Sequence, residues 1–273
     1  MDPFTAPFTR YLADLERSRR ESGNPGPENL VAVCSISSTN HLAREVVAEY
    51  ENEAQALQPT LILAYEQSGG RGRQGRSWSS PAGKGLYATR VLKVEDVEAL
   101  QTLPLLVGVG LCRGLSQHLR PLGVACRLKW PNDLVVETPE GRRKIGGILI
   151  EALVRPGEGA AALIGFGINH GHQAAELPDH GTSAQLLGDR SSLTRWTWDL
   201  VAALEQELAH LGDVTYALAA YSEHTVHRTG EPISARVGDG VVEGRFAGFD
   251  ERGRLLLDRD GEELRLTAGE VIE

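Results

Sequence analysis

The stretch around which this chain is organised is QSGGRGRQGRSWSSPAGKGLYATR, residues 67–90. It holds five cationic side chains and no carboxylate, although the whole chain has a formal net charge of -9. A local positive excess in an acidic chain indicates a small anionic ligand rather than a long polyanion such as DNA. Its glycines permit positive φ, so we expect backbone N–H groups to converge on that anion. The cations are Arg71, Arg73, Arg76, Lys84 and Arg90, and the glycines are Gly69, Gly70, Gly72 and Gly75.

Two phosphate-binding motifs match the sequence of this stretch, but the residues that follow it do not match either motif. Gly70, Gly72 and Gly75 spell the G-x-G-x-x-G of dinucleotide-binding folds, and the loop nearly spells a Walker A motif with Arg in place of Lys. Both motifs require the loop to open directly into a helix. Here the chain continues as the helix-breaking SWSSPAGKG (77–85) and the strand-like LYATRVL (86–92). We therefore expect neither fold, while a flexible Gly/Arg loop with nonspecific affinity for RNA stays an alternative.

The bulk composition is that of an ordinary globular protein. With 273 residues, 41% hydrophobic and 24% charged, the chain has room for one large domain and a small one. Cys34, Cys112 and Cys126 form no CxxC pair and are odd in number, so we expect neither a disulfide framework nor a thiolate zinc site. No apolar run resembles a signal peptide or a membrane span. These features predict a soluble, cytoplasmic protein without membrane contact.

Periodicity and turn signals predict alternating helices and strands up to about residue 228. Helices are predicted over 8–20, from 38 or 39 towards 51, and over 99–119, 194–211 and 213–226. Strands are predicted over 30–36, 60–66, 85–92 and 161–169, with more inside 124–154, and residues 171–192 are predicted to be a loop. Ser38 and Thr39 are placed to cap a helix, and that role alone would explain these polar residues.

Two turns inside residues 124–154 gather charge. Pro131 ends one strand because it cannot donate to the ladder, and the Asn-Asp pair after it favours a turn. The Pro-Glu-Gly sequence at 139–141 predicts a hairpin that brings Lys144 back beside Lys129.

One sheet could bring together the four cations Arg71, Arg73, Lys129 and Lys144. Arg binds phosphate or carboxylate bidentately and Lys adds a point charge. Such a set suits a reaction that gathers negative charge at phosphorus, and no nucleophile-and-base pair is visible in the sequence.

Aromatic, small and imidazole side chains near these cations admit two readings each. Trp78 is either a core residue or a lid over a nucleobase, and Gly165 and Gly167 would let a flat ligand approach. His170 and His172 could bind a metal, but they lack partners at ligand spacing, so a surface loop is the favoured interpretation.

The sequence pattern changes near Thr229, after which predicted short strands alternate with Gly-Asp turns. We expect an α+β fold in which a mixed-sheet catalytic domain flanked by helices (30–228) follows an N-terminal extension (1–29). A small C-terminal all-β barrel, of the Src-homology-3-like kind, is expected over 229–273. About thirty residues before the first strand are too few for a helix-turn-helix domain.

Several long motifs, in order, resemble the biotin protein ligase (biotin-[acetyl-CoA-carboxylase] ligase) family over residues 30–273. They are SSTN (37–40), GRGRQGRSW (70–78), KWPNDL (129–134), RKIGGILIE (143–151) and GFGIN (165–169). The resemblance implies that biotin attacks the α-phosphate of ATP to give biotinyl-5′-AMP and pyrophosphate, with Mg²⁺. A lysine of the biotin carboxyl carrier protein of acetyl-CoA carboxylase then takes the biotinyl group.

The resemblance also implies which residues form the site. Biotin would contact Ser38, Thr39, Asn40, Gln67, Arg71, Gly72, Arg73, Lys144 and Gly147. ATP would contact Arg73, Arg76, Trp78, Lys129, Asn132 and Asn169. The catalytic residues would be Lys144, Arg71, Arg73 and Asp133. Asp133 would either position Mg²⁺ or take a proton from the incoming amine, and no other metal ligand is assigned.

The family's repressor branch carries a DNA-binding domain before the first strand, so we expect a ligase without operator binding and without DNA as a partner. A homodimer through a sheet edge is common in the family, but no interface can be read from the sequence. Three alternatives remain: a biotin or nucleotide sensor without turnover, a lipoate-type ligase, which lacks the GRGRxGRxW loop, and an RNA-binding module.

Overall fold

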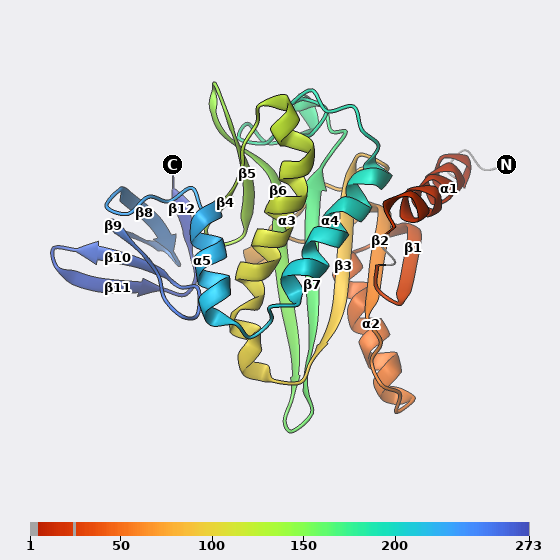
Figure 1. Cartoon of the computed structure of the whole chain (residues 1–273), viewed down its shortest axis with the longest axis horizontal. Helices are drawn as coiled ribbons and strands as arrows, with labels where there is room; N and C mark the ends of the chain where they lie inside the picture. Colours follow the sequence, from red (N-terminus) through yellow and green to blue (C-terminus); the bar gives the residue numbers. More distant parts are fainter. Residues whose placement is uncertain (1–4, 24–25, 273) are drawn as a thin grey trace.

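The computed structural model describes residues 5–23 and 26–272 (Figure 1). Within them, seven strands form one mixed sheet in the order β1-β2-β3-β7-β6-β5-β4. β1 and β2 are parallel, and the other neighbours are antiparallel. The strands are β1 (Asn29–Ile36), β2 (Thr60–Gln67), β3 (Gly85–Val94), β4 (Cys126–Lys129), β5 (Asp133–Thr138), β6 (Gly141–Arg155) and β7 (Gly159–Asn169). This topology, and the entry of the Gly/Arg loop into a strand, exclude the dinucleotide-binding and P-loop folds.

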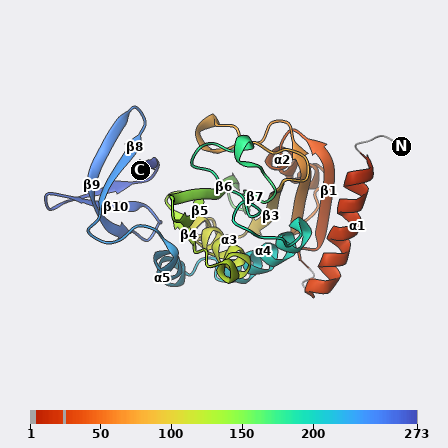
Figure 2. The same cartoon turned by 90° about the horizontal axis from the view of Figure 1, so that it is seen from above.

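Helices flank the sheet, as expected for the α+β class. α3 and α4 lie across one face, with α5 towards the C-terminal strands, α2 lies on the other face, and α1 packs on α4 and β1 (Figures 1 and 2). Their bounds are α1 (Thr5–Ser22), α2 (Thr39–Asn52), α3 (Leu103–Leu119), α4 (Leu193–Leu208) and α5 (Val214–His224). Short 3-10 turns are η1 (Arg73–Gly75), η2 (Val97–Gln101), η3 (Arg120–Leu122) and η4 (Ala174–Glu176). None of these described helices is long and apolar enough to cross a membrane.

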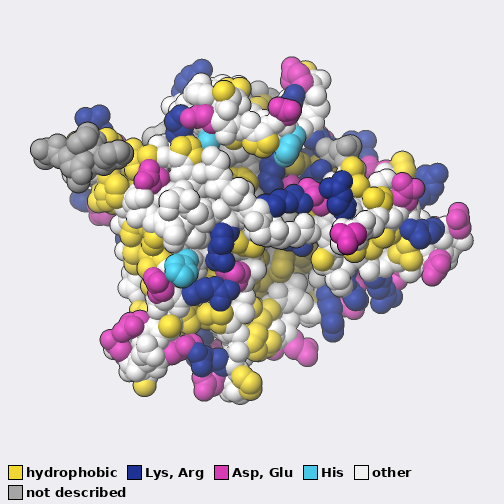
Figure 3. Space-filling model, turned by 180° about the vertical axis from the view of Figure 1, so that it is seen from behind, with side chains coloured by type: hydrophobic (Ala, Val, Ile, Leu, Met, Phe, Trp, Pro, Cys, Tyr) yellow, Lys and Arg dark blue, Asp and Glu magenta, His cyan; other side chains and the backbone are white. Residues whose placement is uncertain are grey.

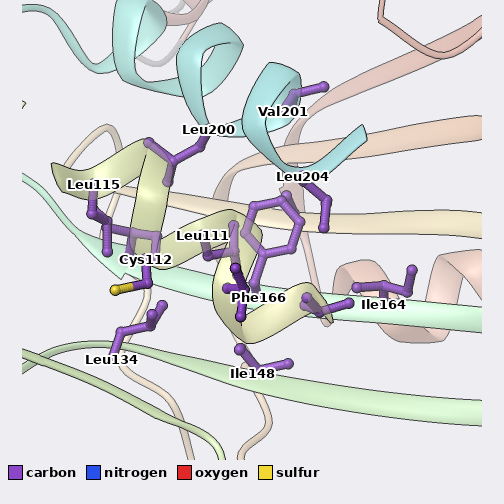
Figure 4. Close-up of a cluster of buried hydrophobic side chains, with 14 of the residues drawn as sticks. Leu111, Cys112, Leu115, Leu134, Ile148, Ile164, Phe166, Leu200, Val201 and Leu204 are labelled. Atoms are coloured by element: carbon purple, nitrogen blue, oxygen red, sulfur yellow. The ribbon is translucent and has the colours of Figure 1, made fainter. Parts of the chain in front are cut away.

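The main core lies between the sheet and α3 and α4. Even-numbered residues of β7, and of β6 from Gly146 onwards, such as Ile148, Ile164 and Phe166, point into it and meet Leu111 and Leu204 (Figure 4). Alternate residues of a strand face opposite sides, so the odd-numbered ones face α2 and the space beside it.

The predicted long apolar helix is confirmed, but its start differs. Residues 97–101 form a 3-10 turn, and α3 begins at Leu103 with Pro104 in its first turn, where proline is tolerated. The glycines of α3 allow it to pack closely on α4. A Cβ on Gly110 would lie only 2.8 Å from the Cα of Leu204, so a larger residue there would push the two helices apart.

The C-terminal part is the expected small all-β unit. Five strands pair antiparallel in the order β11-β10-β9-β8-β12 within the described range 232–272. They are β8 (Pro232–Val237), β9 (Gly240–Phe249), β10 (Leu255–Arg259), β11 (Glu262–Leu266) and β12 (Glu270–Ile272), of which β12 was not anticipated. Trp130, from the β4–β5 turn, inserts into their core, and its Nε1 donates to the Gly253 carbonyl at 3.2 Å. The smaller unit is therefore anchored on the turn that carries KWPND.

Candidate active site

A cavity opens on the α2 face of the sheet, beneath the Gly/Arg loop. Its floor is made by odd-numbered residues of β6 and β7, among them Gly147, Leu149, Gly165 and Gly167. Its walls come from the start of α2, the loop, the β4–β5 turn and Glu270 of β12. Figure 3 shows the molecule from the side opposite α3 and α4, with Lys and Arg side chains and carboxylates interspersed near the middle of the face.

Nearly all of the predicted site residues line this one cavity, including all four cations that were expected to meet. They are Ser38, Thr39, Asn40, Gln67, Arg71, Gly72, Arg73, Arg76, Trp78, Lys129, Asn132, Asp133, Lys144 and Gly147. The exception is Asn169. Its amide donates to the Thr182 carbonyl at 3.1 Å, outside the lining, so its proposed nucleotide contact stays a prediction.

The start of α2 and Gln67 form one end of the cavity. The side-chain oxygen Oε1 of Gln67 accepts from the Thr39 N–H at 2.8 Å and from the Thr39 hydroxyl at 3.2 Å. The side-chain Nε2 of Gln67 donates to the Ser80 hydroxyl at 2.9 Å. Ser38 occupies the N-cap position, but its side chain makes no capping hydrogen bond with the residues that the structure describes. Helix capping by side chains therefore does not explain this polar cluster.

Glu151 ties this end of the cavity to the Gly/Arg loop. Its carboxylate accepts from Asn40 at 2.8 Å, Arg44 at 2.7 Å and Arg71 at 3.1 Å. Burial raises the pKa of the Glu151 carboxyl, but the bonds from Arg44 and Asn40 and the charge of Arg71 hold that pKa below its usual range. Glu151 has no role predicted from the sequence, although its odd position on β6 matches that of Gly147 and places it on the cavity face.

Asp133 stands beside both lysines of the site. The Lys144 ammonium lies 2.6 Å from the Asp133 carboxylate. The backbone of Asp133, on β5, pairs with that of Lys129, on β4. The predicted hairpin is present, but β5 lies between the strands of the two lysines, so Lys144 is not directly beside Lys129.

The two arginines nearest Asp133 differ in their surroundings. Arg73 donates to the side-chain oxygen of Asn132 at 3.3 Å. Burial and the charge of Arg76 lower the Arg73 pKa, although the negative charges of Asp133 and Glu270 act in the opposite direction. Arg76 donates two hydrogen bonds, of 2.9 and 2.5 Å, to Glu270 of β12, and these lower the pKa of that carboxyl. The link to Glu270 was not foreseen, because it joins residues far apart in the sequence.

Trp78 supplies the flat group that rests on the glycine floor. A Cβ on Gly167 would lie 2.5 Å from its Nε1, and one on Gly147 would lie 3.3 Å from its ring. The Lys144 ammonium lies 5.5 Å from the ring centroid, within cation–π range. The Trp78 Nε1 is buried without a hydrogen-bond partner among the described residues. Trp78 therefore lines the cavity rather than the apolar core.

Two expectations about the loop are wrong. Of its four glycines only Gly75 has positive φ, and the amides of Gly69, Gly72 and Trp78 bond to backbone carbonyls instead of pointing at an anion. The positive charge is therefore presented by side chains. Lys84 and Arg90 do not take part: they pair with Glu176 and with Glu205 of α4.

The surface-loop interpretation of His170 and His172 is also wrong. Both are buried, at 4% and 0% exposure, and burial lowers the pKa of each imidazole. Among residues 5–23 and 26–272, no group of His, Cys, Asp or Glu is arranged to hold a metal ion.

Comparison with known sequences decides the family. A profile described as the Biotin/lipoate A/B protein ligase family matches residues 32–169, and one described as the Biotin protein ligase C terminal domain matches 229–272. The chain belongs to the biotin/lipoate A/B protein ligase family. This ligase is 32% identical to the bifunctional ligase/repressor BirA of Salmonella typhimurium, over 96% of its own length and 80% of that protein. It is 32% identical to the biotin-[acetyl-CoA-carboxylase] ligase of Paracoccus denitrificans, over 75% and 88% of the two chains.

Solved structures agree with the fold of this ligase. The biotin protein ligase from Aquifex aeolicus in complex with biotin and ATP superposes with a TM-score of 0.70 at 24% identity, covering 90% of this chain and 98% of that one. The Leishmania major biotin protein ligase in complex with biotinyl-5-AMP gives 0.56 at 23% identity, covering 89% and 100%. At these identities the likeness concerns the fold, which is a mixed sheet with a C-terminal all-β unit.

Proposed function

We propose that this ligase activates biotin with ATP and transfers it to a lysine of a biotin carboxyl carrier protein. In the first step a biotin carboxylate oxygen bonds to the α-phosphorus of ATP, and pyrophosphate leaves with the electrons of the broken P–O bond. In the second, the lysine amine bonds to the biotinyl carbonyl carbon, loses a proton, and AMP leaves. The observation that carries the proposal is the convergence of Arg71, Arg73, Lys129 and Lys144 on one glycine-floored cavity.

The cations would supply the electrostatic part of catalysis. Lys144 would lie between the biotin carboxylate and the α-phosphate, where negative charge develops, with Arg71 and Arg73 beside it. In the free protein Lys144 and Arg71 are paired with Asp133 and Glu151, so the arriving anions would exchange with these carboxylates. Prepaired side chains have fewer conformations to lose when the ligand binds.

Biotin would occupy the end of the cavity formed by α2. Ser38, Thr39 and Asn40 offer buried donors and acceptors there, the half-buried Gln67 lies beside them, and Gly72 and Gly147 leave room for the ligand. Sites built to hydrogen-bond a polar ligand reject analogues that leave their groups unpaired, which is a basis for choosing biotin over lipoate. The nucleotide would lie towards Arg76, Trp78, Lys129 and Asn132, with Asn169 behind them.

Mg²⁺ does not fit as an ion held by the protein alone. Mg²⁺ prefers one or two carboxylates together with substrate phosphates and water. Asp133 is the carboxylate in the right place, but it is already paired with Lys144 at 2.6 Å. We propose that Mg²⁺ enters as part of the ATP complex and assign Asp133 first to holding Lys144; removal of the amine proton remains its second proposed role.

Biotin-dependent exchange of labelled pyrophosphate into ATP tests the first step, with purified protein, Mg²⁺ and no carrier. We expect exchange with biotin and none with lipoate. Biotin binding without exchange would favour the sensor alternative, and exchange with lipoate would favour the lipoate-type ligase. Transfer of labelled biotin to a purified carrier protein tests the second step. The division of the chain into 1–29, 30–228 and 229–273 is proposed as well, and the profile match over 229–272 supports its second boundary.

A further inference from the structure

The neighbour of β6 changes at the position of Lys144. Gly146 of β6 still pairs with Ile168 of β7. β7 ends at Asn169, however, before it reaches the level of Lys144. From there a segment of the loop after β7, residues 178–185, takes its place, and we call this segment the strap. In Figure 1 the loop after β7 (teal) crosses the upper end of the sheet.

The strap holds the main chain of Lys144 from both of its peptide groups. The Lys144 N–H donates to the His180 carbonyl at 2.7 Å, and the Lys144 carbonyl accepts from the Thr182 N–H at 2.9 Å. Val135 of β5 is its neighbour on the other side. The backbone from which the Lys144 side chain extends is thus fixed by β5 and by the strap, not by β7.

Two buried side chains fix the strap in turn. The Asn169 amide donates to the Thr182 carbonyl at 3.1 Å, and the Ser183 hydroxyl donates to the His172 carbonyl at 2.7 Å. Asn169 is 5% exposed and Ser183 is 0% exposed. Neither lines the cavity, so neither is placed to touch the reacting atoms.

We propose that Asn169 and Ser183 are positioning residues for Lys144 and act on it through the strap. The proposal rests on the proposed function, because it takes Lys144 as the group that meets the developing charge. Electrostatic catalysis depends on donors that are already in place, and a misplacement of about 1 Å can cost on the order of 100-fold in rate. A loosened strap would therefore lower turnover without removing any contact to biotin or ATP.

The test compares Ser183→Ala and Asn169→Ala with the wild type in biotin-dependent pyrophosphate exchange. We expect kcat to fall by about 10- to 100-fold in each, and in Ser183→Ala the KM values for biotin and ATP should stay within about twofold. In Asn169→Ala the predicted nucleotide contact would add a rise in the KM for ATP to the fall in kcat. In a Lys144→Ala background, single-turnover adenylate formation should fall no further when Ser183→Ala is added. Unchanged kcat in both variants would overturn the proposal, and so would a full additional loss from Ser183→Ala in the Lys144→Ala background. An Asn169→Ala effect confined to the KM for ATP would also overturn it, because it would indicate direct nucleotide contact alone.

Hydrogen exchange gives a readout that does not depend on activity. The amide of Lys144 should exchange faster in Ser183→Ala than in the wild type, and equal rates would overturn the link through the strap. Ser18→Ala is the matched control, since its hydroxyl is also buried and bonded, to Thr194 at 3.0 Å, but far along the chain from the strap. It should change neither readout. If wild-type protein shows no biotin-dependent exchange, the proposed function fails, while the hydrogen-exchange comparison still decides the structural link.

Discussion

The ammonium of Lys144 lies 2.6 Å from the carboxylate of Asp133, and both side chains are about three-quarters buried at the wall of the cavity. Neighbouring strands carry the two residues, and the pair holds a positive charge beside the glycine floor. The pair explains how a lysine can be kept in place before any anion arrives, and it makes the first prediction specific.

Lys144→Ala should lower pyrophosphate exchange by about 10²–10³-fold or more while leaving the fold intact. Loss of one well-placed donor typically costs about 10²–10³ in turnover, and Lys144 is proposed to serve both reacting anions. The free energy of unfolding should fall by only about 1 kcal/mol, because Asp133 stays partly hydrated. Exchange assays and thermal unfolding measure the two quantities. Lys93→Ala, which breaks a surface pair with Glu95, is the control, and near-normal turnover of Lys144→Ala would refute the assignment.

Trp78→Ala should weaken ATP binding more than biotin binding. The indole lies on Gly147 and Gly167 beneath the Lys144 ammonium, and stacking on a base is worth about 1–3 kcal/mol. We expect the Kd for ATP to rise about tenfold or more, and calorimetry measures both ligands. Trp78→Phe keeps a flat ring and should recover most of the affinity. Equal weakening of both ligands would contradict the nucleotide role.

Gly165→Ala should damage the biotin end of the cavity. Its Cβ would lie 2.3 Å from the side-chain oxygen of Asn40, which accepts from Thr89 at 2.6 Å, so Asn40 must move. We expect biotin affinity to fall about tenfold, the equivalent of one lost hydrogen bond. Gly240→Ala is the control, because its nearest neighbour would be 3.7 Å away. Biotin affinity unchanged by Gly165→Ala would remove Asn40 from the site.

Features that depend on local sequence could be predicted, and contacts between residues far apart in the chain could not. The KWPND turn could be predicted because Pro131 and the residues after it act on their own backbone. The odd-numbered face of β6 and β7 follows from strand alternation, so Gly147, Gly165 and Gly167 could be placed together. These elements brought most of the expected site residues into one cavity.

Pairings that depend on tertiary packing were missed. Nothing near Arg76 in the sequence indicates that Glu270, 194 residues away, will be its partner. Burial of His170 and His172 was missed for the same reason, since Gly and polar neighbours resemble a surface loop until Trp196 packs against His170. The loop amides were misjudged because a Gly-rich sequence permits an anion nest without requiring one.

Glu151→Gln should destabilise the protein near neutral pH and not in acid. The folded-state pKa of Glu151 is below the ordinary value of 4.5, so its contribution is present above that pH and is lost as the pH falls through the folded pKa. We expect a loss of about 1 kcal/mol at pH 7, because Arg44 and Arg71 lose a charged acceptor. The difference from wild type should shrink below pH 4.5, as measured by denaturant unfolding. Glu45→Gln, at an exposed position, is the control, and a difference that does not depend on pH would argue against the charge.

His227→Gln should flatten the loss of stability between pH 6.5 and 4. Burial, with the charges of Arg142 and Lys129, lowers the pKa of His227 to about 4, although Glu231 opposes the shift. Over that window the unfolded imidazole binds a proton and the folded one does not, so acid favours unfolding by up to about 1.4 kcal/mol per pH unit. His227 accepts from the Trp130 N–H at 3.2 Å, so the effect acts where the two units join. Parallel curves for wild type and His227→Gln would show that His227 does not titrate with unfolding.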